Sequence, residues 1–265
     1  MGILEDTGRF LYGLVESAGR GTILFLQALA QCRYFPRNLD KFLGQVFVCG
    51  VSAIPVVAIT ATFTGMVIAA QTGTELKKYG LADLTIGPIV GASMCREMGP
   101  VLTAICVAGF VGGGMASVIA TMRVNEEIDA LEVMSINPVR FLVMPRLTAM
   151  MIALPLLTVF ADFVGILGGA LVAQFQVGVT YFVFFDYLKW ALALRDIAFG
   201  LVKAWTFAVI ITMVACEQGM SASGGAEGVG RATMRSVVYS FLLILVANYL
   251  LFSLVYRTIF TKVWS

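Results

Sequence analysis

The 265-residue chain contains no histidine, the side chain most often used as a metal ligand and as a general base. Its five cysteines are scattered through largely apolar stretches, and no C-x-x-C pair occurs. Zinc fingers, histidine-based metal centres and Ser-His or Cys-His nucleophilic catalysis are therefore excluded. The motifs G-x-S-x-G and H-E-x-x-H are also missing, so we expect no catalytic residue and no metal site.

Charged residues are also scarce, at 13% of the chain, whereas hydrophobic residues make up 59%. Several apolar runs exceed the roughly 18 to 20 residues that a helix needs to cross about 30 Å of hydrocarbon. The composition therefore predicts an all-α, polytopic helical membrane protein. The net charge is +2 and no Lys/Arg-rich segment occurs, so nucleic acid is not an expected partner.

The first 41 residues have the pattern of an amphipathic helix that lies in the membrane interface, followed by a basic linker over residues 33–41. The apolar arc of the helical wheel holds Ile3, Leu4, Phe10, Leu11, Leu14, Val15 and Ala18. The acidic residues Glu5 and Asp6 stand where a secretory signal would be basic, so no cleavable signal is expected. Residues 42–265 are expected to form one membrane domain.

Five crossings are expected in this domain. Their approximate limits are 46–70, 100–122, 147–175, 197–216 and 237–260. Residues 72–83 are expected to form a polar loop. Residues 85–99 are expected to form a short outer or re-entrant segment, because Arg96, Glu97 and Pro100 interrupt the apolar pattern. A second polar loop, with Asp186 and Asp196, precedes the fourth crossing. Five crossings place the termini on opposite sides of the membrane.

The lysines and arginines beside the crossings predict the orientation. Ten fall on the side of the N-terminus: Arg9, Arg20, Arg33, Arg37, Lys41, Arg123, Arg140, Arg146, Arg231 and Arg235. Six fall on the other side: Lys77, Lys78, Lys189, Arg195, Arg257 and Lys262. The bias favours a cytoplasmic N-terminus and places the segment from Arg123 to Arg146 in the cytoplasm.

That segment is a charged island between two apolar crossings. Its periodicity predicts a short helix with an apolar side formed by Val124, Ile128, Leu131 and Met134 and an acidic side formed by Glu126, Asp129 and Glu132. Asn125 can cap the start of this helix, and Glu126 and Glu127 suit the positive end of its dipole. A docking helix for a cytoplasmic partner is one interpretation, and a solvated connecting loop is the other.

Glycines four residues apart occur in three apolar stretches: Gly87 with Gly91, Gly109 with Gly113, and Gly165 with Gly169. Each pair permits close backbone approach, either within the subunit or across a dimer seam. No G-x-x-x-x-G-K-[ST] motif occurs, so the chain lacks the phosphate-binding loop of an ATPase. Energy from ATP would have to come from another subunit.

Four motifs occur in order along the chain: REMGPVLTAICVAG at 96–109, MRVNEEIDALEVMSINP at 122–138, LVMPR at 142–146 and GGAEGVGRAT at 224–233. Together they closely resemble the MlaE family of ABC-transporter permeases, over about residues 40 to 260. The resemblance implies a homodimeric permease for phospholipid or a related lipid, in a bacterial inner membrane or alternatively in a chloroplast inner envelope membrane. It also implies a cytoplasmic ABC ATPase that binds the ATP and an MCE-domain lipid-binding protein, with no cofactor on this chain.

The resemblance further assigns roles to individual residues. Arg96 and Glu97 match the family's RE[LM]GP motif, which faces the lipid cavity, and Lys203 matches a basic residue of the fourth crossing. The segment at about 123–135 matches the coupling helix that contacts the ATPase. Its coupling residues would be Arg123, Glu126, Glu127, Asp129, Leu131 and Glu132.

Three positions depart from the family pattern, because Phe110, Val118 and Asn248 stand where charged residues are common. The charges absent at Phe110 and Val118 are opposite in sign, which fits the removal of an ion pair. Because of these departures, the resemblance does not indicate which lipid head group the cavity prefers.

The positions of Arg96, Glu97 and Lys203 in the sequence also predict their partners. Arg96 and Glu97 are neighbours in the chain and are expected to have separate partners rather than each other. Lys203 either faces the cavity or snorkels to the outer interface. A passive channel or a scaffold subunit fits the composition as well as a permease does, and dependence on ATP would distinguish them.

Overall fold

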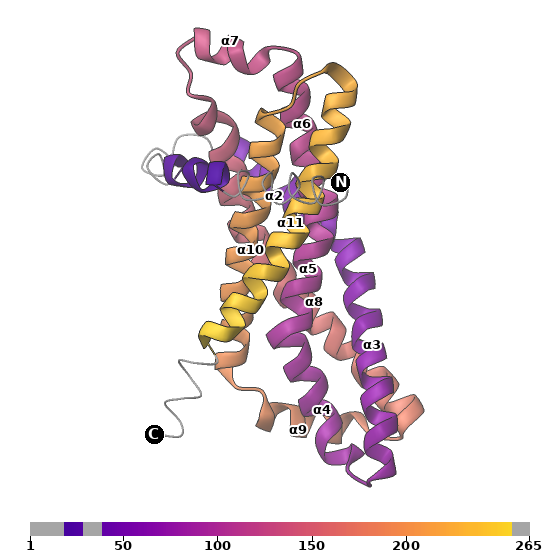
Figure 1. The fold of residues 1–265 in the computed structure, drawn as a ribbon. Coiled ribbons are helices and arrows are strands. Elements are labelled where there is room, and N and C mark those ends of the chain that lie inside the picture. Colours follow the sequence, from indigo (N-terminus) through magenta and orange to yellow (C-terminus); the bar gives the residue numbers. More distant parts are fainter. Residues whose placement is uncertain (1–18, 29–38, 256–265) are drawn as a thin grey trace, which may run out of the picture. The chain divides into compact units, whose positions relative to one another are not determined.

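The computed structural model describes residues 19–28 and 39–255. The described residues form helices joined by short connections, and no strand occurs among them, which confirms the all-α fold class (Figure 1). Residues 19–28 are helical. The expected interfacial helix over residues 1–18 and most of the linker lie outside the described residues.

Five helical segments of the described ranges are long and apolar enough to cross a membrane. They are Gly44–Lys78, Ala82–Val124, Val139–Val177, Leu194–Met220 and Gly225–Leu254. The predicted number of crossings is therefore confirmed.

The first two segments are more continuous than expected. The first consists of α2 (Leu39–Gly50), the 3₁₀ turn η2 (Val51–Ala53) and α3 (Ile54–Lys78). The second consists of α4 (Ala82–Ser93), the π-helical turn η3 (Met94–Met98), α5 (Gly99–Val107), the π-helical turn η4 (Ala108–Gly112) and α6 (Gly113–Val124). The predicted loop at 72–83 is wrong, because α3 continues to Lys78. The expected break of the helix near Arg96, Glu97 and Pro100 does not occur, because a π-helical turn keeps the backbone helical there, and a re-entrant segment over 85–99 is thereby excluded.

The remaining helices follow the charged island. They are α7 (Glu127–Val133), the π-helical turn η5 (Val139–Val143), α8 (Met144–Val172), the π-helical turn η6 (Ala173–Val177), α9 (Tyr181–Ala191), α10 (Leu194–Met220) and α11 (Gly225–Val255). The expected polar loop before the fourth crossing contains α9, which buries Phe184 and Leu188. The last crossing begins at Gly225 rather than near residue 237.

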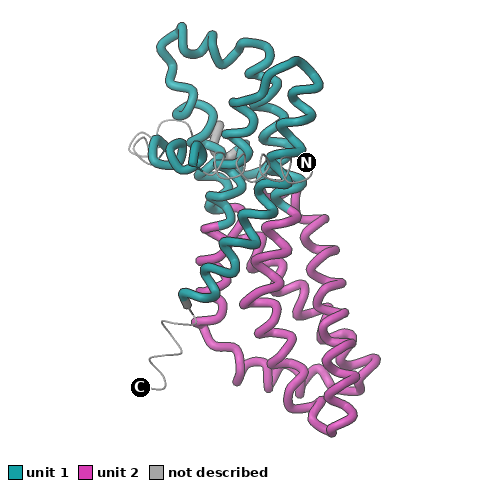
Figure 2. Tube along the Cα trace, viewed as in Figure 1, with its two compact units in different colours: residues 1–49, 107–152, 207–265 teal, residues 50–106, 153–206 magenta. Residues whose placement is uncertain are grey.

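The chain divides into two compact units (Figure 2). Unit 1 comprises residues Met1–Cys49, Val107–Ile152 and Phe207–Ser265, and unit 2 comprises Gly50–Cys106 and Ala153–Thr206. The helices α8 and α10 contribute residues to both units.

Glycines bring the helices of unit 2 close together. A Cβ atom added to Gly65 of α3 would overlap the carbonyl group of Gly165 on α8. A Cβ atom added to Gly87 of α4 would likewise overlap the carbonyl oxygen of Phe184 on α9. Two of the three predicted glycine pairs therefore pack helices within the chain.

Unit 1 has its own apolar core. Buried residues of several elements form one cluster, namely Ala28, Ile119, Ile128, Leu131, Leu142, Val143, Met144, Leu147, Met213 and Cys216. The helix α6 packs along α11, where a Cβ atom on Gly113 would lie 3.2 Å from Cγ2 of Val237. The third glycine pair thus also has a packing partner inside the subunit.

We expect Gly65→Ala to destabilise the protein, because the new methyl group meets backbone that cannot rotate away. Overpacking of this kind costs about 1 to 3 kcal/mol. Gly114→Ala is the matched control, since nothing lies within 4 Å of a Cβ atom at Gly114 of α6. Thermal unfolding in detergent should show a lower transition temperature for Gly65→Ala only. Equal temperatures for the two variants would contradict the close contact between α3 and α8.

The predicted orientation can be tested by cysteine labelling. A single cysteine at position 78 should react with an impermeant maleimide in intact spheroplasts, whereas one at position 126 should react only after the membrane is opened. Both substitutions are made in a background without the native cysteines. Labelling of position 126 in intact spheroplasts would rule out this topology.

Candidate functional site

The candidate site lies in unit 2 and begins at the π-helical turn η3. Pro100, in the first turn of α5, has no backbone N–H, so the carbonyl of Arg96 loses its usual helical donor. The side chain of Lys203 supplies a donor instead, with Nζ 2.9 Å from the Arg96 carbonyl oxygen. The local sequence REMGP therefore creates an acceptor that another helix must satisfy.

Two ion pairs connect this turn to α10. The Arg96 guanidinium donates to both carboxylate oxygens of Asp196, from Nε at 2.8 Å and from Nη2 at 3.1 Å. The Lys203 ammonium donates to Glu97 Oε1 at 2.6 Å. The expectation that Arg96 and Glu97 have separate partners is confirmed.

The three α10 residues of the site lie on one helix face. Asp196, Phe199 and Lys203 are spaced by three and four residues. The Lys203 ammonium lies 4.6 Å from the centre of the Phe199 ring, within the range of a cation–π interaction. Gly200 lies between them, and a Cβ atom there would overlap the carbonyl oxygen of Cys95. The glycine thus allows α10 to approach η3 closely.

The four charged side chains differ in burial, and Arg96 is the most exposed of them, since its partner Asp196 is only 14% exposed. The side chain of Lys203 is fully buried and that of Glu97 is 31% exposed, whereas the side chain of Arg96 is 49% exposed. The alternative that Lys203 snorkels to the outer interface is therefore wrong. A buried ammonium is costly unless it is paired, and Lys203 has an anion, a carbonyl and an aromatic face as partners.

Two acidic residues of unit 2, Asp196 and Asp162, are not among the site residues that the sequence predicts. Asp196 was assigned to a loop, although it lies seven residues before Lys203 and so on the same helix face. Asp162 of α8 is 8% exposed, and its Oδ1 has no hydrogen-bond partner among the described residues. A Cβ atom on Gly99 would overlap this oxygen, so Asp162 packs against the backbone just after η3. Its isolation within a long apolar run was the available signal.

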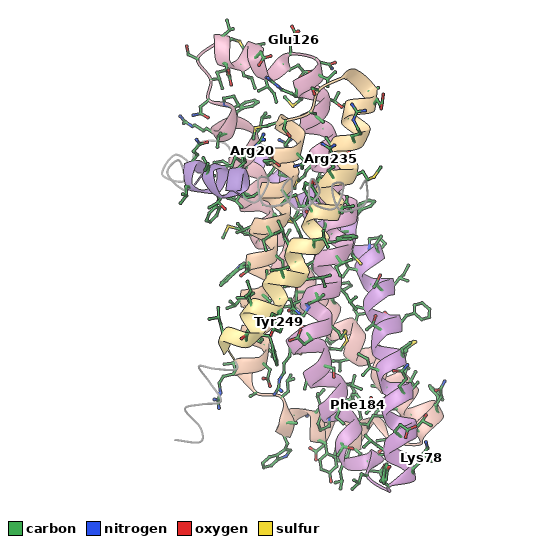
Figure 3. All side chains as sticks on the ribbon, viewed as in Figure 1. Arg20, Lys78, Glu126, Phe184, Arg235 and Tyr249 are labelled. Carbon is green, nitrogen blue, oxygen red and sulfur yellow. The ribbon has the colours of Figure 1, made fainter. Side chains whose placement is uncertain are left out.

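The predicted coupling residues lie in unit 1, around α7 (Figure 3, Glu126). Ile128 and Leu131 are buried in the core of unit 1, whereas Glu126, Glu127, Asp129 and Glu132 are exposed. Arg123, at the end of α6, forms an ion pair with Asp129. Two details differ from the prediction. Glu126, in the left-handed region at φ 61°, precedes the helix in place of Asn125, and Met134 is 61% exposed rather than on the buried side.

The positions that depart from the family pattern also lie in unit 1. Phe110 of η4 is 54% exposed and Val118 of α6 is 52% exposed. Asn248 lies in α11. The side chains of Phe110 and Val118 therefore lie on the surface of unit 1. Charged side chains at these two positions would also be exposed.

The fold and the charged cluster define a multi-pass membrane protein with paired charges inside its crossings. Residues 42–254 match the family described as Permease MlaE, and the chain belongs to this family. It is thus an MlaE-family ABC transporter permease, and the resemblance found in the sequence motifs is confirmed.

The chain is also similar in sequence to three proteins from other organisms. A probable ABC transporter permease protein of Rickettsia felis is 37% identical over 258 residues, which cover 93% of this chain and 99% of the relative. A probable permease of Synechocystis is 38% identical over 220 residues, covering 83% of each chain. The Arabidopsis thaliana protein TRIGALACTOSYLDIACYLGLYCEROL 1, chloroplastic, is 34% identical over 208 residues, or 78% of this chain and 59% of that protein. The five apolar helices and these relatives fit the expected multi-pass location in an inner membrane.

Proposed function

We propose that this permease moves a phospholipid or a related lipid between membranes, driven by ATP hydrolysis on a separate cytoplasmic ABC ATPase. The proposal includes a homodimer and an MCE-domain lipid-binding protein as partners. Membership in the family supports it, as does the Arabidopsis relative, whose name contains that of a galactolipid. The absence of a phosphate-binding loop in the sequence supports a separate ATPase.

The half-exposed guanidinium of Arg96 carries the proposal for lipid binding. Asp196 holds this group in a fixed orientation through two hydrogen bonds, and the remaining N–H donors can bind a head-group phosphate. Glu97 is partly exposed beside it and can interact with a cationic or hydroxylated part of the head group. The charges would contact the head group, and apolar side chains would contact the acyl chains.

Lys203 acts in this scheme as a positioning residue. Its ammonium holds the Glu97 carboxylate and the Arg96 carbonyl and is itself inaccessible. Its effect on lipid binding would therefore be indirect, through the orientation of Arg96 and Glu97.

The exposed acidic side of α7 is the proposed contact with the ATPase. Ile128 and Leu131 anchor this short helix to the core of unit 1, so force applied to α7 reaches the crossings that form that core. Val133 and Met134, which are 86% and 61% exposed, extend the surface with apolar side chains. An acidic surface with an apolar end suits a partner that carries basic and apolar residues.

We expect Arg96→Ala to reduce the phospholipid retained by the purified complex by about tenfold, because a charge-assisted hydrogen bond to phosphate is lost. Arg195→Ala is the matched control, since Arg195 is exposed and adjacent to Asp196. Retained lipid is measured by mass spectrometry at equal protein amounts. If Arg96→Ala retains as much lipid as Arg195→Ala, Arg96 does not bind the head group.

A further inference from the structure

Asp162 is a buried carboxyl group inside the third crossing, Val139–Val177, where α8 contacts Gly99 at the start of α5. It is 8% exposed, and its Oδ1 has no hydrogen-bond partner among the described residues. An ionised carboxylate that is buried in a membrane protein without a partner is strongly unfavourable, whereas a neutral carboxyl group costs far less. The burial of Asp162 therefore raises the question of what neutralises it.

The contact between Asp162 and the π-helical turn η3 brings two oxygen atoms together. A Cβ atom on Gly99 would lie 1.7 Å from Oδ1 of Asp162 and 2.9 Å from the carbonyl oxygen of Met94, so both oxygens lie beside the same glycine. A carbonyl oxygen and an ionised carboxylate can only accept hydrogen bonds, whereas a protonated carboxyl group has an O–H donor. A proton on Asp162 therefore supplies a donor at a contact between two acceptors.

The charged side chains of η3 and α10 are paired with each other rather than with this carboxyl group. Arg96 forms its ion pair with Asp196, and Glu97 forms its ion pair with Lys203. The Cys95 thiol of η3 interacts electrostatically with the carboxyl group, and a thiol is uncharged in its ordinary form. The cluster beside η3 thus supplies no cation to the carboxyl group.

The other helices around this contact do not supply a cation either. The helix α5 contains no charged residue, and α3, which approaches α8 at Gly65, contains none before Glu75. Arg146 lies at the start of α8 and donates to the Leu142 carbonyl. A metal ion would need several ligands, and no group of three His, Cys, Asp or Glu side chains that could hold one occurs among the residues that the structure describes. The ligand that suits this carboxyl group is a proton.

We propose that Asp162 binds a proton and that the neutral carboxyl group keeps η3 packed against α8. When the proton leaves to water, the carboxylate repels the Met94 carbonyl and requires hydration, so η3 separates from α8. Arg96 and Glu97 belong to the same turn, and their contacts with a lipid head group weaken when it moves. This effect on lipid binding rests on the proposed function, whereas the proton site does not.

Infrared spectroscopy tests for the proton directly. A difference spectrum is recorded between the wild type and Asp162→Asn in lipid nanodiscs near neutral pH. We expect the wild type to show the C=O stretch of a protonated carboxyl group, which shifts in D2O and is lost in the variant. The matched control Asp83→Asn, at an exposed position of α4, should remove only carboxylate bands. Carboxylate bands from Asp162 in place of the C=O stretch would overturn the proposal.

The pH dependence of unfolding provides a second test. An aspartate in the unfolded chain loses its proton at about pH 4, so a folded state that keeps the proton binds more protons than the unfolded state and loses stability as the pH rises. Between about pH 5 and pH 7 the unfolding equilibrium constant of the wild type should increase about tenfold per pH unit relative to that of Asp162→Asn. Equal slopes for the two proteins would overturn the proposal. Stabilisation of the wild type alone by sodium chloride, compared with choline chloride, would also overturn it and identify a metal cation as the ligand.

Retained phospholipid tests the link between Asp162 and the head-group site. Between about pH 7 and pH 9 the amount retained by the wild type should fall at least twofold relative to Asp162→Asn, because only the wild type has a proton to lose at this position. An equal fall in the two proteins would overturn this link. Failure of the proposed lipid contact is a separate result, in which Arg96→Ala retains as much lipid as the wild type while the infrared and unfolding results still hold.

Discussion

Replacement of Glu97 by alanine is expected to destabilise the protein by about 3 kcal/mol, because it leaves the buried ammonium of Lys203 without its anion. The carbonyl of Arg96 and the ring of Phe199 would still contact this ammonium, and neither is negatively charged. This loss of unfolding free energy is at the lower end of the range for breaking a buried ion pair, because Glu97 is 31% exposed. The measurement is unfolding of the purified permease by denaturant in detergent.

Two controls make this result specific to the buried pair. Glu75→Ala breaks the exposed pair with Lys78, whose side chains are more than half exposed, and should cost less than about 1 kcal/mol. The double variant Glu97→Leu, Lys203→Met removes both charges and should recover most of the stability. Equal losses for Glu97→Ala and Glu75→Ala would show that Lys203 does not depend on Glu97.

Reversal of two charges on α7 is expected to abolish copurification with the ATPase while membrane insertion is retained. The variant is Glu127→Lys with Glu132→Lys, and both side chains are exposed. Opposed like charges at an interface cost several kcal/mol, which corresponds to a loss of affinity of a hundredfold or more. Asp129 is left unchanged because its ion pair with Arg123 belongs to the fold of the permease.

The matched control is the double reversal Asp83→Lys with Asp186→Lys, at exposed positions of α4 and α9 on the side predicted to be extracytoplasmic. This control should copurify with the ATPase as the wild type does. If the α7 variant also copurifies normally and transports lipid, α7 is not the coupling surface.

Composition was sufficient to predict the all-α class and the five crossings, because the length of an apolar run is set by bilayer thickness. Lengths of individual helices were harder to predict. The sequence 72–78 is polar and was assigned to a loop, yet Glu75 and Lys78 form an exposed pair on the last turns of α3. Polarity alone does not distinguish a loop from a helix that extends beyond the hydrocarbon.

The charged cluster was predicted only in part. Arg96, Glu97 and Lys203 were found by resemblance to a family, and the structure brings them together. The partners of Arg96 and Glu97 come from α10, about 100 residues later in the chain, and pairing over that separation is a tertiary effect that the local sequence does not indicate. Asp196 completes the cluster from the first turn of α10, although its polar neighbours in the sequence predict a loop there.

Reconstitution would show whether this chain is the membrane subunit of an ATP-driven lipid transporter. Permease and ATPase are placed together in proteoliposomes that carry a fluorescent phospholipid, and transfer to acceptor vesicles with the MCE-domain partner is followed over time. We expect transfer only when ATP and all partners are present, and less transfer with Arg96→Ala. Transfer at the same rate without ATP would instead identify a passive channel.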